Sequence, residues 1–172
     1  EIAQQLGCVF VGVEYRLGLF GWNCLPALCS GSDDTGNFAL LDIAKALDWV
    51  KENAASFGGD PQNVTLFGFS AGGRDALALL ASPLAEGRFQ KVISCSGGLT
   101  LADPDESAAL LAAALTPLAM EDGKAPTASA AKNWLLSTDP AVRDWLCGVE
   151  AARLSAVLPN AGLRMTAFPH LY

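Results

Sequence analysis

Residues 63–73 read NVTLFGFSAGG, and this stretch decides the fold. The run from Val64 to Phe69 is apolar and predicts a buried strand. The run from Ala71 to Ala81 has the composition of a helix. Between the two lies a Gly-x-Ser-x-Gly turn, which consists of Gly68, Phe69, Ser70, Ala71 and Gly72. The stretch therefore raises the question of whether Ser70 is a nucleophile.

A Gly-x-Ser-x-Gly turn between a strand and a helix is typical of a nucleophile elbow. We expect a strained backbone at Ser70, with Gly68 and Gly72 leaving room for the sharp turn. The Ser70 hydroxyl then projects above the sheet edge. The amide N–H of Ala71 points into the same space from a helix N-terminus, where it stabilises a developing oxyanion. The alternative is a structural serine, and the strand and helix that flank the turn favour the nucleophile.

Strands and helices also alternate on both sides of the turn. Cys8 to Tyr15, CVFVGVEY, is an apolar run that predicts a strand buried on both faces. Asn37 to Ser56 has the spacing of an amphipathic helix, and Lys91 to Cys95 predicts a third strand. A helix between two strands implies a parallel crossover. Residues 1–98 therefore predict an open α/β layer structure in the order β-α-β-α-β.

A mainly helical region is expected over residues 99–172. Alanine and leucine dominate its composition, and we predict about four short helices followed by an irregular tail. Prolines are expected to break these helices at Pro104, Pro117, Pro126, Pro140 and Pro159.

The composition limits the classes of partner. The chain has 172 residues, of which 51% are hydrophobic and 17% charged, so it can form one globular domain. Its 11 basic and 18 acidic residues give a net charge of −7 without a cluster of lysine or arginine, which argues against a nucleic-acid partner. The longest apolar runs, such as residues 108–115, are too short to span a bilayer.

The cysteines do not predict a disulfide framework, because their number is odd and their spacing irregular. Cys8 and Cys95 lie in apolar runs and are expected in the core. Cys24 and Cys29 share a loop and can pair in an oxidising compartment, but free thiols in a reducing cell are the preferred interpretation. The compartment stays open, with the cysteines favouring the cytoplasm. One histidine and no Cys-x-x-Cys motif argue against a zinc site.

Three segments resemble the type-B carboxylesterase family, which includes bacterial p-nitrobenzyl esterases and, more distantly, cholinesterases. They read VEYRLGLFGW, TGNFALLDIAKALDWVKENAASFGGDPQNVTLFGFSAGG and FQKVISCSGG. The family's corresponding sequence motifs are N-Y-R-L-G, G-N-x-G-L-x-D, F-G-G-D-P-x-N-V-T-x-x-G-E-S-A-G and Q-S-G, in the same order and with similar spacing. The resemblance is strong over residues 8–98 and weak beyond them.

The resemblance implies an α/β-hydrolase fold and hydrolysis of small-molecule carboxylic esters without a cofactor. Ser70 takes the position of the nucleophile and Ala71 that of an oxyanion-hole residue. Ser96 takes the place of a family serine that forms a hydrogen bond behind the catalytic triad, and a plain hydroxyl at a strand end is the alternative. Arg16 and Asp42 look like family structural charges, which we expect to be paired.

Two departures from the family's wording affect the site. Phe69 stands where the family has a glutamate just before the serine, which should alter the electrostatics of the site and its substrate preference. Arg74 and Asp75 follow the elbow where the family has small residues. We expect these charges to face solvent, and the alternative is that they face the acyl pocket.

The rest of the triad is expected outside the chain. The fold orders its triad as Ser, Asp or Glu, then His. His170 is the only histidine, and the acids before it include Asp103, Asp105, Glu106, Asp122, Asp139 and Asp144. No late strand precedes His170, so we interpret it as a structural histidine. The family's H-G-G-G oxyanion loop is expected before Glu1. We therefore expect residues 1–172 to be a fragment, a single incomplete α/β-hydrolase domain.

The sequence thus predicts a serine hydrolase that acts on carboxylic esters through an acyl-enzyme, with its acid and histidine encoded elsewhere. A serine peptidase or amidase on the same fold is one alternative, because the elbow is shared. A non-catalytic adhesion or binding member of the family is the other, and its members lack the serine. The oligomeric state stays open.

Overall fold

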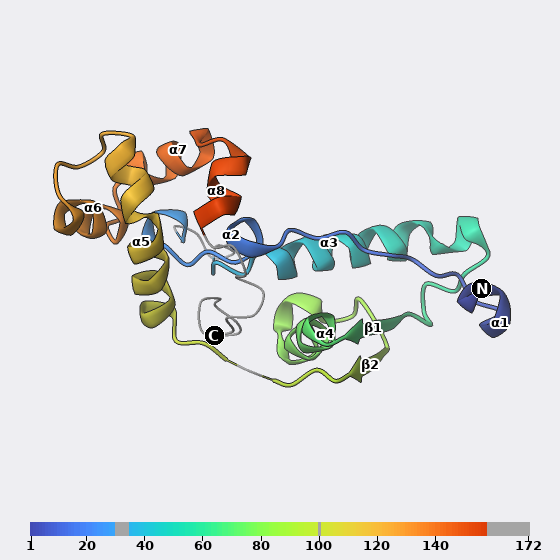
Figure 1. Ribbon diagram of the computed structural model, residues 1–172. Helices are drawn as coiled ribbons and strands as arrows, with labels where there is room; N and C mark the ends of the chain where they lie inside the picture. Colours follow the sequence, from blue (N-terminus) through green and yellow to red (C-terminus); the bar gives the residue numbers. More distant parts are fainter. Residues whose placement is uncertain (30–34, 100, 158–172) are drawn as a thin grey trace. The chain divides into compact units, whose positions relative to one another are not determined.

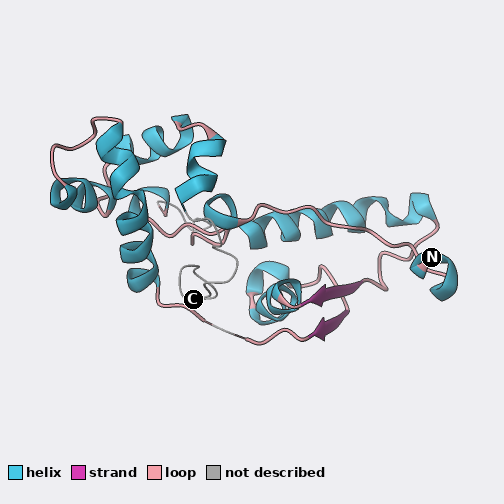
Figure 2. Ribbon diagram, viewed as in Figure 1, coloured by secondary structure: helices cyan, strands magenta, loops and turns pink. Residues whose placement is uncertain are grey.

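The computed structural model describes residues 1–29, 35–99 and 101–157 (Figure 1). The chain divides into two compact units. One takes Glu1–Tyr15 and Leu40–Thr100, and the other takes Arg16–Ala39 and Leu101–Tyr172. The first contains the strands and the second is helical (Figure 2). The assignment of residues 1–172 to one incomplete domain stays a prediction.

The α/β unit is built around two parallel strands (Figure 2). Strand β1 is Thr65–Phe69 and β2 is Lys91–Cys95, and their register runs from Thr65 opposite Lys91 to Phe69 opposite Cys95. Helix α4, Ala71–Ala81, connects them and packs on both. A 3-10 turn, η3, follows at Pro83–Ala85. The predicted strand, helix and strand are thus observed, with bounds that agree to within one residue.

Helix α3, Phe38–Asn53, precedes this unit's strands in the chain, and the 3-10 turn η2, Ala54–Phe57, extends it. The turn ends at Gly58, whose φ of 82° suits glycine. The face predicted to be apolar is buried, at Leu40, Ile43, Ala44 and Leu47. On the polar side Arg88 donates to Asp48 over 2.7 Å, and this bond lowers the pKa of the Asp48 carboxyl. The prediction of an amphipathic helix over residues 37–56 is confirmed.

The strand predicted for Cys8 to Tyr15 is wrong. The chain begins with a short helix, α1, Ile2–Leu6, and residues 9–17 form neither helix nor strand. Cys8 is exposed, so its assignment to the core is also wrong, and Phe10 is 57% exposed. A strand exists only where a neighbour satisfies its backbone N–H and C=O groups. No strand in the described part of the chain pairs with this segment.

The helical unit contains two short elements and four longer helices. The short ones are α2, Gly18–Gly21, and the 3-10 turn η1, Pro26–Leu28. The longer ones are α5, Pro104–Glu121, α6, Ala128–Leu135, α7, Pro140–Gly148, and α8, Ala151–Val157. They enclose a core in which Leu111, Leu115 and Leu135 are fully buried. The four predicted helices are therefore observed.

The prolines of this region do not all break helices as predicted. Pro104 and Pro140 occupy first-turn positions, where the missing N–H would be unsatisfied anyway, so they begin helices. The side chains of Asp103 and Asp139 cap the same two helices by accepting N–H donors. Pro117 lies inside α5, so the break expected there is wrong. Pro159 is outside the described residues.

Side chains join the helices of this unit at their ends. Asp122, which follows α5, accepts hydrogen bonds from Trp145 Nε1 on α7 at 2.8 Å and from Arg153 Nη2 on α8 at 2.7 Å. These donors lower the pKa of the Asp122 carboxyl. The carboxylate therefore holds the C-terminal end of α5 to two other helices.

The described residues include no helix long and apolar enough to cross a bilayer.

The pairing considered for Cys24 and Cys29 is not observed, because no disulfide joins them. Burial raises the pKa of the Cys24 thiol to about 12, and this thiol donates to the Pro104 carbonyl. Cys95 is only half-buried.

Candidate active site

Ser70 lies at the junction between β1 and α4, where the chain turns sharply. It is the N-cap residue of α4, with φ 53° and ψ −114°. A positive φ is uncommon for a residue other than glycine and costs about 1–3 kcal/mol. Ser70 is exposed, and its side chain makes no capping hydrogen bond to the helix. The turn therefore presents the hydroxyl at an accessible position instead of using it to stabilise α4.

Backbone contacts hold this turn in place. The Ser70 N–H donates to the Cys95 carbonyl at the end of β2 over 2.8 Å, and the Arg74 N–H donates to the Ser70 carbonyl over 3.0 Å. A Cβ added to Gly68 would lie only 2.1 Å from the carbonyl oxygen of Gly72. Only glycine therefore fits at residue 68, where β1 and the first turn of α4 come together.

The second glycine of the motif has more space than the glycine after it. A Cβ on Gly72 would meet its nearest neighbour, the Tyr15 hydroxyl oxygen, at 3.9 Å. A Cβ on Gly73 would lie 2.8 Å from Ser94 Oγ. The close approach of α4 to β2 is therefore at Gly73, which the sequence analysis did not single out. The doubled glycine after Ala71 was the available signal.

Two serines near the end of β2, Ser94 and Ser96, differ in burial and bonding. Because Phe69 pairs with Cys95, Ser70 and Ser96 follow neighbouring strands at the same edge of the sheet. Ser96 is exposed and has a φ of 55°. Ser94, by contrast, donates its hydroxyl hydrogen to the Gly73 carbonyl over 3.0 Å. The structure thus places a serine hydrogen bond beneath the elbow at Ser94, a polar residue in an apolar strand.

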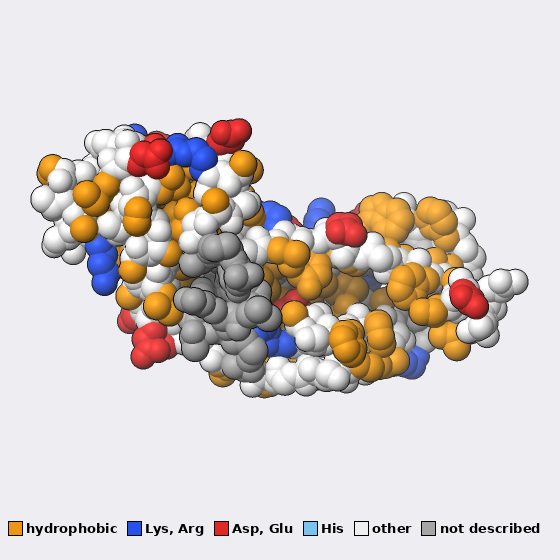
Figure 3. All heavy atoms as spheres, viewed as in Figure 1, with side chains coloured by type: hydrophobic (Ala, Val, Ile, Leu, Met, Phe, Trp, Pro, Cys, Tyr) orange, Lys and Arg blue, Asp and Glu red, His pale blue; other side chains and the backbone are white. Residues whose placement is uncertain are grey.

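Phe69 is the residue that departs from the family's glutamate. Its side chain is 68% exposed, and it lies on the same face of β1 as Phe67, which is 56% exposed. Hydrophobic side chains are exposed over this unit (Figure 3). The residue that directly precedes Ser70 therefore has an exposed apolar side chain without charge.

The two charges after the elbow differ in their surroundings. Arg74 is half-buried, and Asp75 is only 3% exposed, so the expectation that both face solvent is wrong for Asp75. Its Oδ2 accepts a hydrogen bond from the Tyr15 hydroxyl over 3.0 Å. Burial raises the pKa of the Asp75 carboxyl, and the Tyr15 hydrogen bond and the Arg74 charge oppose this shift.

The acids considered for the triad belong to the helical unit, whereas Ser70 belongs to the α/β unit. His170 lies outside the described residues. Among the acids before it, Asp103 and Asp139 cap helices, and Asp122 binds Trp145 and Arg153. In the described part of the chain, no group of three or more His, Cys, Asp or Glu side chains is arranged to hold a metal ion.

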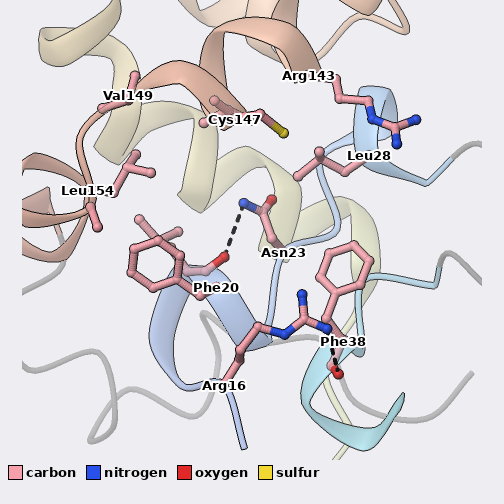
Figure 4. A pocket seen from close by; sticks show the side chains of 12 residues that line it. Arg16, Phe20, Asn23, Leu28, Phe38, Arg143, Cys147, Val149 and Leu154 are labelled. Carbon is pink, nitrogen blue, oxygen red and sulfur yellow. Dashed lines mark hydrogen bonds between the residues drawn. The ribbon is translucent and has the colours of Figure 1, made fainter. Parts of the chain in front are cut away.

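A separate pocket of about 510 Å³ lies within the helical unit (Figure 4). Arg16 donates there to the Phe38 carbonyl and lies over the Phe38 ring, 5.6 Å from its centre. The Asn23 side chain donates to the Leu19 carbonyl and accepts from the Leu25 N–H. The sequence analysis had singled out only Arg16 among the lining residues, as a structural charge, and its pairing with Asp42 stays a prediction.

Sequence comparison relates most of the chain to known esterases. The sequence model of the carboxylesterase family matches residues 1–116. The para-nitrobenzyl esterase of Bacillus subtilis (strain 168) is 44% identical over 124 residues, which cover 72% of this chain and 25% of that protein. The fumonisin B1 esterase of Sphingopyxis macrogoltabida is 40% identical over 125 residues, which cover 69% and 23%. The chain thus spans about a quarter of the length of these relatives.

Solved structures agree in fold. A para-nitrobenzyl esterase structure matches with a TM-score of 0.64 and 40% identity, over 88% of this chain and 28% of that one. A carboxylesterase from Geobacillus stearothermophilus matches with a TM-score of 0.66 and 29% identity, over 91% and 30%. The predicted fold class, a partial α/β-hydrolase fold, is confirmed. Because the family match includes β1, the Ser70 turn, α4 and β2, the chain belongs to the carboxylesterase family.

Proposed function

We propose that this chain is the nucleophile-bearing part of a longer serine hydrolase that cleaves small-molecule carboxylic esters. The observation that carries the proposal is the geometry of Ser70, an exposed serine with a positive φ between a parallel strand and a helix N-terminus. A strained, accessible serine in that context matches the requirements of a nucleophile elbow. The relatives named above support an ester as the substrate, because each is an esterase.

In the proposed reaction, Ser70 Oγ attacks the ester carbonyl carbon and gives its proton to a histidine from outside residues 1–172. The carbonyl oxygen gains negative charge, and the N–H of Ala71, in the first turn of α4, donates a hydrogen bond to it. The alkoxide leaves with the proton from the histidine, and an acyl-enzyme remains on Ser70. Water, deprotonated by the same histidine, then attacks the acyl-enzyme, and the histidine returns this proton to Ser70 Oγ as the carboxylic acid is released.

Residues 1–172 alone are expected to be nearly inert. In serine hydrolases, removal of a triad member lowers the rate by several orders of magnitude, even when the nucleophile is intact. Ester turnover by the isolated chain that both Ser70→Ala and His170→Ala abolish would refute this expectation. It would also identify His170 as the base.

The test of the proposed function is hydrolysis of p-nitrophenyl butyrate by the full-length protein and its Ser70→Ala variant. We expect turnover in the first and its loss in the second, with a matched loss of covalent labelling by an organophosphorus reagent. A Ser94→Ala variant serves as the control, because it removes a nearby hydroxyl that is bonded to Gly73 and leaves the proposed nucleophile.

Other outcomes separate the alternatives. Turnover of a peptide amide instead of the ester would favour a serine peptidase or amidase. A folded full-length protein without turnover or labelling would favour a non-catalytic binding role, and the exposed Phe69 beside Ser70 would then be the first surface to examine.

A further inference from the structure

The only acidic side chain buried in the described part of the chain lies close to the proposed nucleophile. Asp75 is 3% exposed and follows Ser70 by five residues on α4. Burial of a carboxyl group is unfavourable unless hydrogen bonds compensate for the lost water. A buried acid beside the elbow, at a helix position where alanine or serine would fit without this cost, therefore requires an explanation.

Tyr15 supplies one hydrogen bond and connects the acid to the elbow. Its hydroxyl donates to Asp75 Oδ2 over 3.0 Å, although the two residues are 60 positions apart. The same hydroxyl oxygen lies 3.9 Å from the place that a Cβ on Gly72 would occupy. The Tyr15 hydroxyl therefore lies close to both Asp75 and Gly72, and Gly72 directly follows the proposed oxyanion donor Ala71.

This hydrogen bond joins residues 9–15, which form neither helix nor strand, to α4. That segment has no strand partner among the described residues, so the sheet does not hold it. The Tyr15 hydroxyl keeps its proton over the usual range of assay, because burial and the Asp75 charge raise its pKa to about 12. Tyr15 therefore remains a donor at every pH at which ester hydrolysis is ordinarily measured.

Two polar atoms in and beside the pair lack hydrogen-bond partners among the described residues. Asp75 Oδ1 and Arg74 Nε are both buried and have no hydrogen-bond partner in the described part of the chain. A half-satisfied polar cluster is costly, and each such group in a native structure needs an explanation. Because the Tyr15 hydroxyl lies close to Gly72 and is bonded to Asp75, this cluster is in a position to act on the first turn of α4.

We propose that Asp75 and Tyr15 form a positioning pair for the nucleophile elbow. Their hydrogen bond holds the phenol against the first turn of α4, and this contact fixes the orientation of the Ala71 amide and of Ser70. Neither side chain touches the substrate. The proposal rests on the proposed ester hydrolysis, because its effect is read through the turnover of Ser70.

The test measures kcat and KM for p-nitrophenyl butyrate in the full-length protein, in four single variants and in the Tyr15→Phe/Asp75→Ala double variant. Tyr15→Phe removes the donor, Asp75→Ala removes the acceptor, and Asp75→Asn keeps an acceptor oxygen. The fourth, Leu79→Ala, truncates a side chain of α4 that is 1% exposed, so it destabilises the same helix without removing a hydrogen bond of the pair. Rates are expressed per folded molecule, from the unfolding curve of each variant.

We expect Tyr15→Phe and Asp75→Ala each to lower kcat roughly 10- to 100-fold, the range expected when a catalytic group is misplaced by about 1 Å. KM should change by less than about threefold, and the double variant should be no slower than the single variants, because both remove one interaction. Asp75→Asn should retain most of the activity. Leu79→Ala should keep the kcat of the unmodified protein.

Three results would overturn the pairing. They are a kcat loss no larger than that of Leu79→Ala, additive losses in the double variant, or an effect on KM alone. The failure of the proposed function is distinguishable, because the unmodified protein would then show no turnover that depends on Ser70. In that case hydrogen exchange of the α4 amides decides, with faster exchange in Asp75→Ala than in Leu79→Ala supporting the pair and equal exchange refuting it.

Discussion

Replacing Ser70 by glycine should make the protein more stable than replacing it by alanine. Both variants remove the hydroxyl, so their difference reports only on the backbone. Alanine keeps the Cβ that makes φ 53° and ψ −114° unfavourable, at about 1–3 kcal/mol, whereas glycine adopts these angles without that cost. Glycine also gains about 0.4–1 kcal/mol of conformational entropy in the unfolded chain, which opposes the effect. The net advantage of glycine is therefore about 1 kcal/mol.

The assay is urea unfolding of the full-length Ser70→Gly and Ser70→Ala variants, followed by circular dichroism. Ser129, exposed in α6, provides the control, because its helical backbone has a negative φ. At Ser129 glycine should be less stable than alanine by up to about 1 kcal/mol, which is the opposite order. If glycine is the less stable substitution at Ser70 as well, the strain that we infer for the elbow is absent and the reasoning fails. Neither Ser70 variant should turn over an ester.

Three further substitutions test the elbow, the buried acid and the helical core. Gly68→Ala should lower the free energy of unfolding by about 1–3 kcal/mol or more and lower turnover, because its Cβ would lie 2.1 Å from the Gly72 carbonyl oxygen. Gly12→Ala is the control, because a Cβ there would have no atom within 4 Å. Equal unfolding midpoints for the two variants would contradict the prediction. Asp75→Asn should become more stable relative to the unmodified protein as the pH rises above about 4. In the unmodified protein the pKa of the Asp75 carboxyl is higher in the folded than in the unfolded state, so its contribution to stability is present at acid pH and is lost as the pH rises through the folded-state pKa. Unfolding curves at a series of pH values measure this gain, and a difference that stays constant with pH would count against the raised pKa. Leu111→Ala should lower the free energy of unfolding in urea by about 2–5 kcal/mol, because Leu111 is fully buried. Leu110→Ala, at a neighbouring position that is 48% exposed, should lower it by less than about 0.5 kcal/mol. Similar losses in both variants would mean that the helical core is not packed around Leu111.

Local signals predicted the elements around the elbow well. The apolar run before Gly68 and the doubled glycine after Ala71 mark a strand, a turn and a helix within a few residues of one another. Short-range sterics set each of these, because a Cβ at residue 68 would collide with the backbone four residues later. The same local rules indicate Ser70 as the candidate nucleophile.

The local rules failed where a residue's state depends on neighbours that are distant in the sequence. Cys8 to Tyr15 has the composition of a strand, but the described residues offer it no partner. Pro117 was read as a helix break, yet it lies within α5, whose buried side chains Leu115 and Leu118 hold both sides of the helix in the core. Composition alone shows neither whether a strand partner is present nor whether tertiary packing keeps a proline within a helix.

The sequence by itself determined the fold class, the order of β1, α4 and β2, and the serine at their turn, because steric and periodic rules act over a few residues. Only the tertiary structure decided that Asp75 is buried and bonded to Tyr15, and that Ser94 bonds to Gly73 beneath the elbow. The sequence does not show which way a charged side chain five positions after Ser70 points. Its burial follows from which segments fold against α4, and Tyr15 and Asp75 are 60 positions apart, so no local signal indicates that contact.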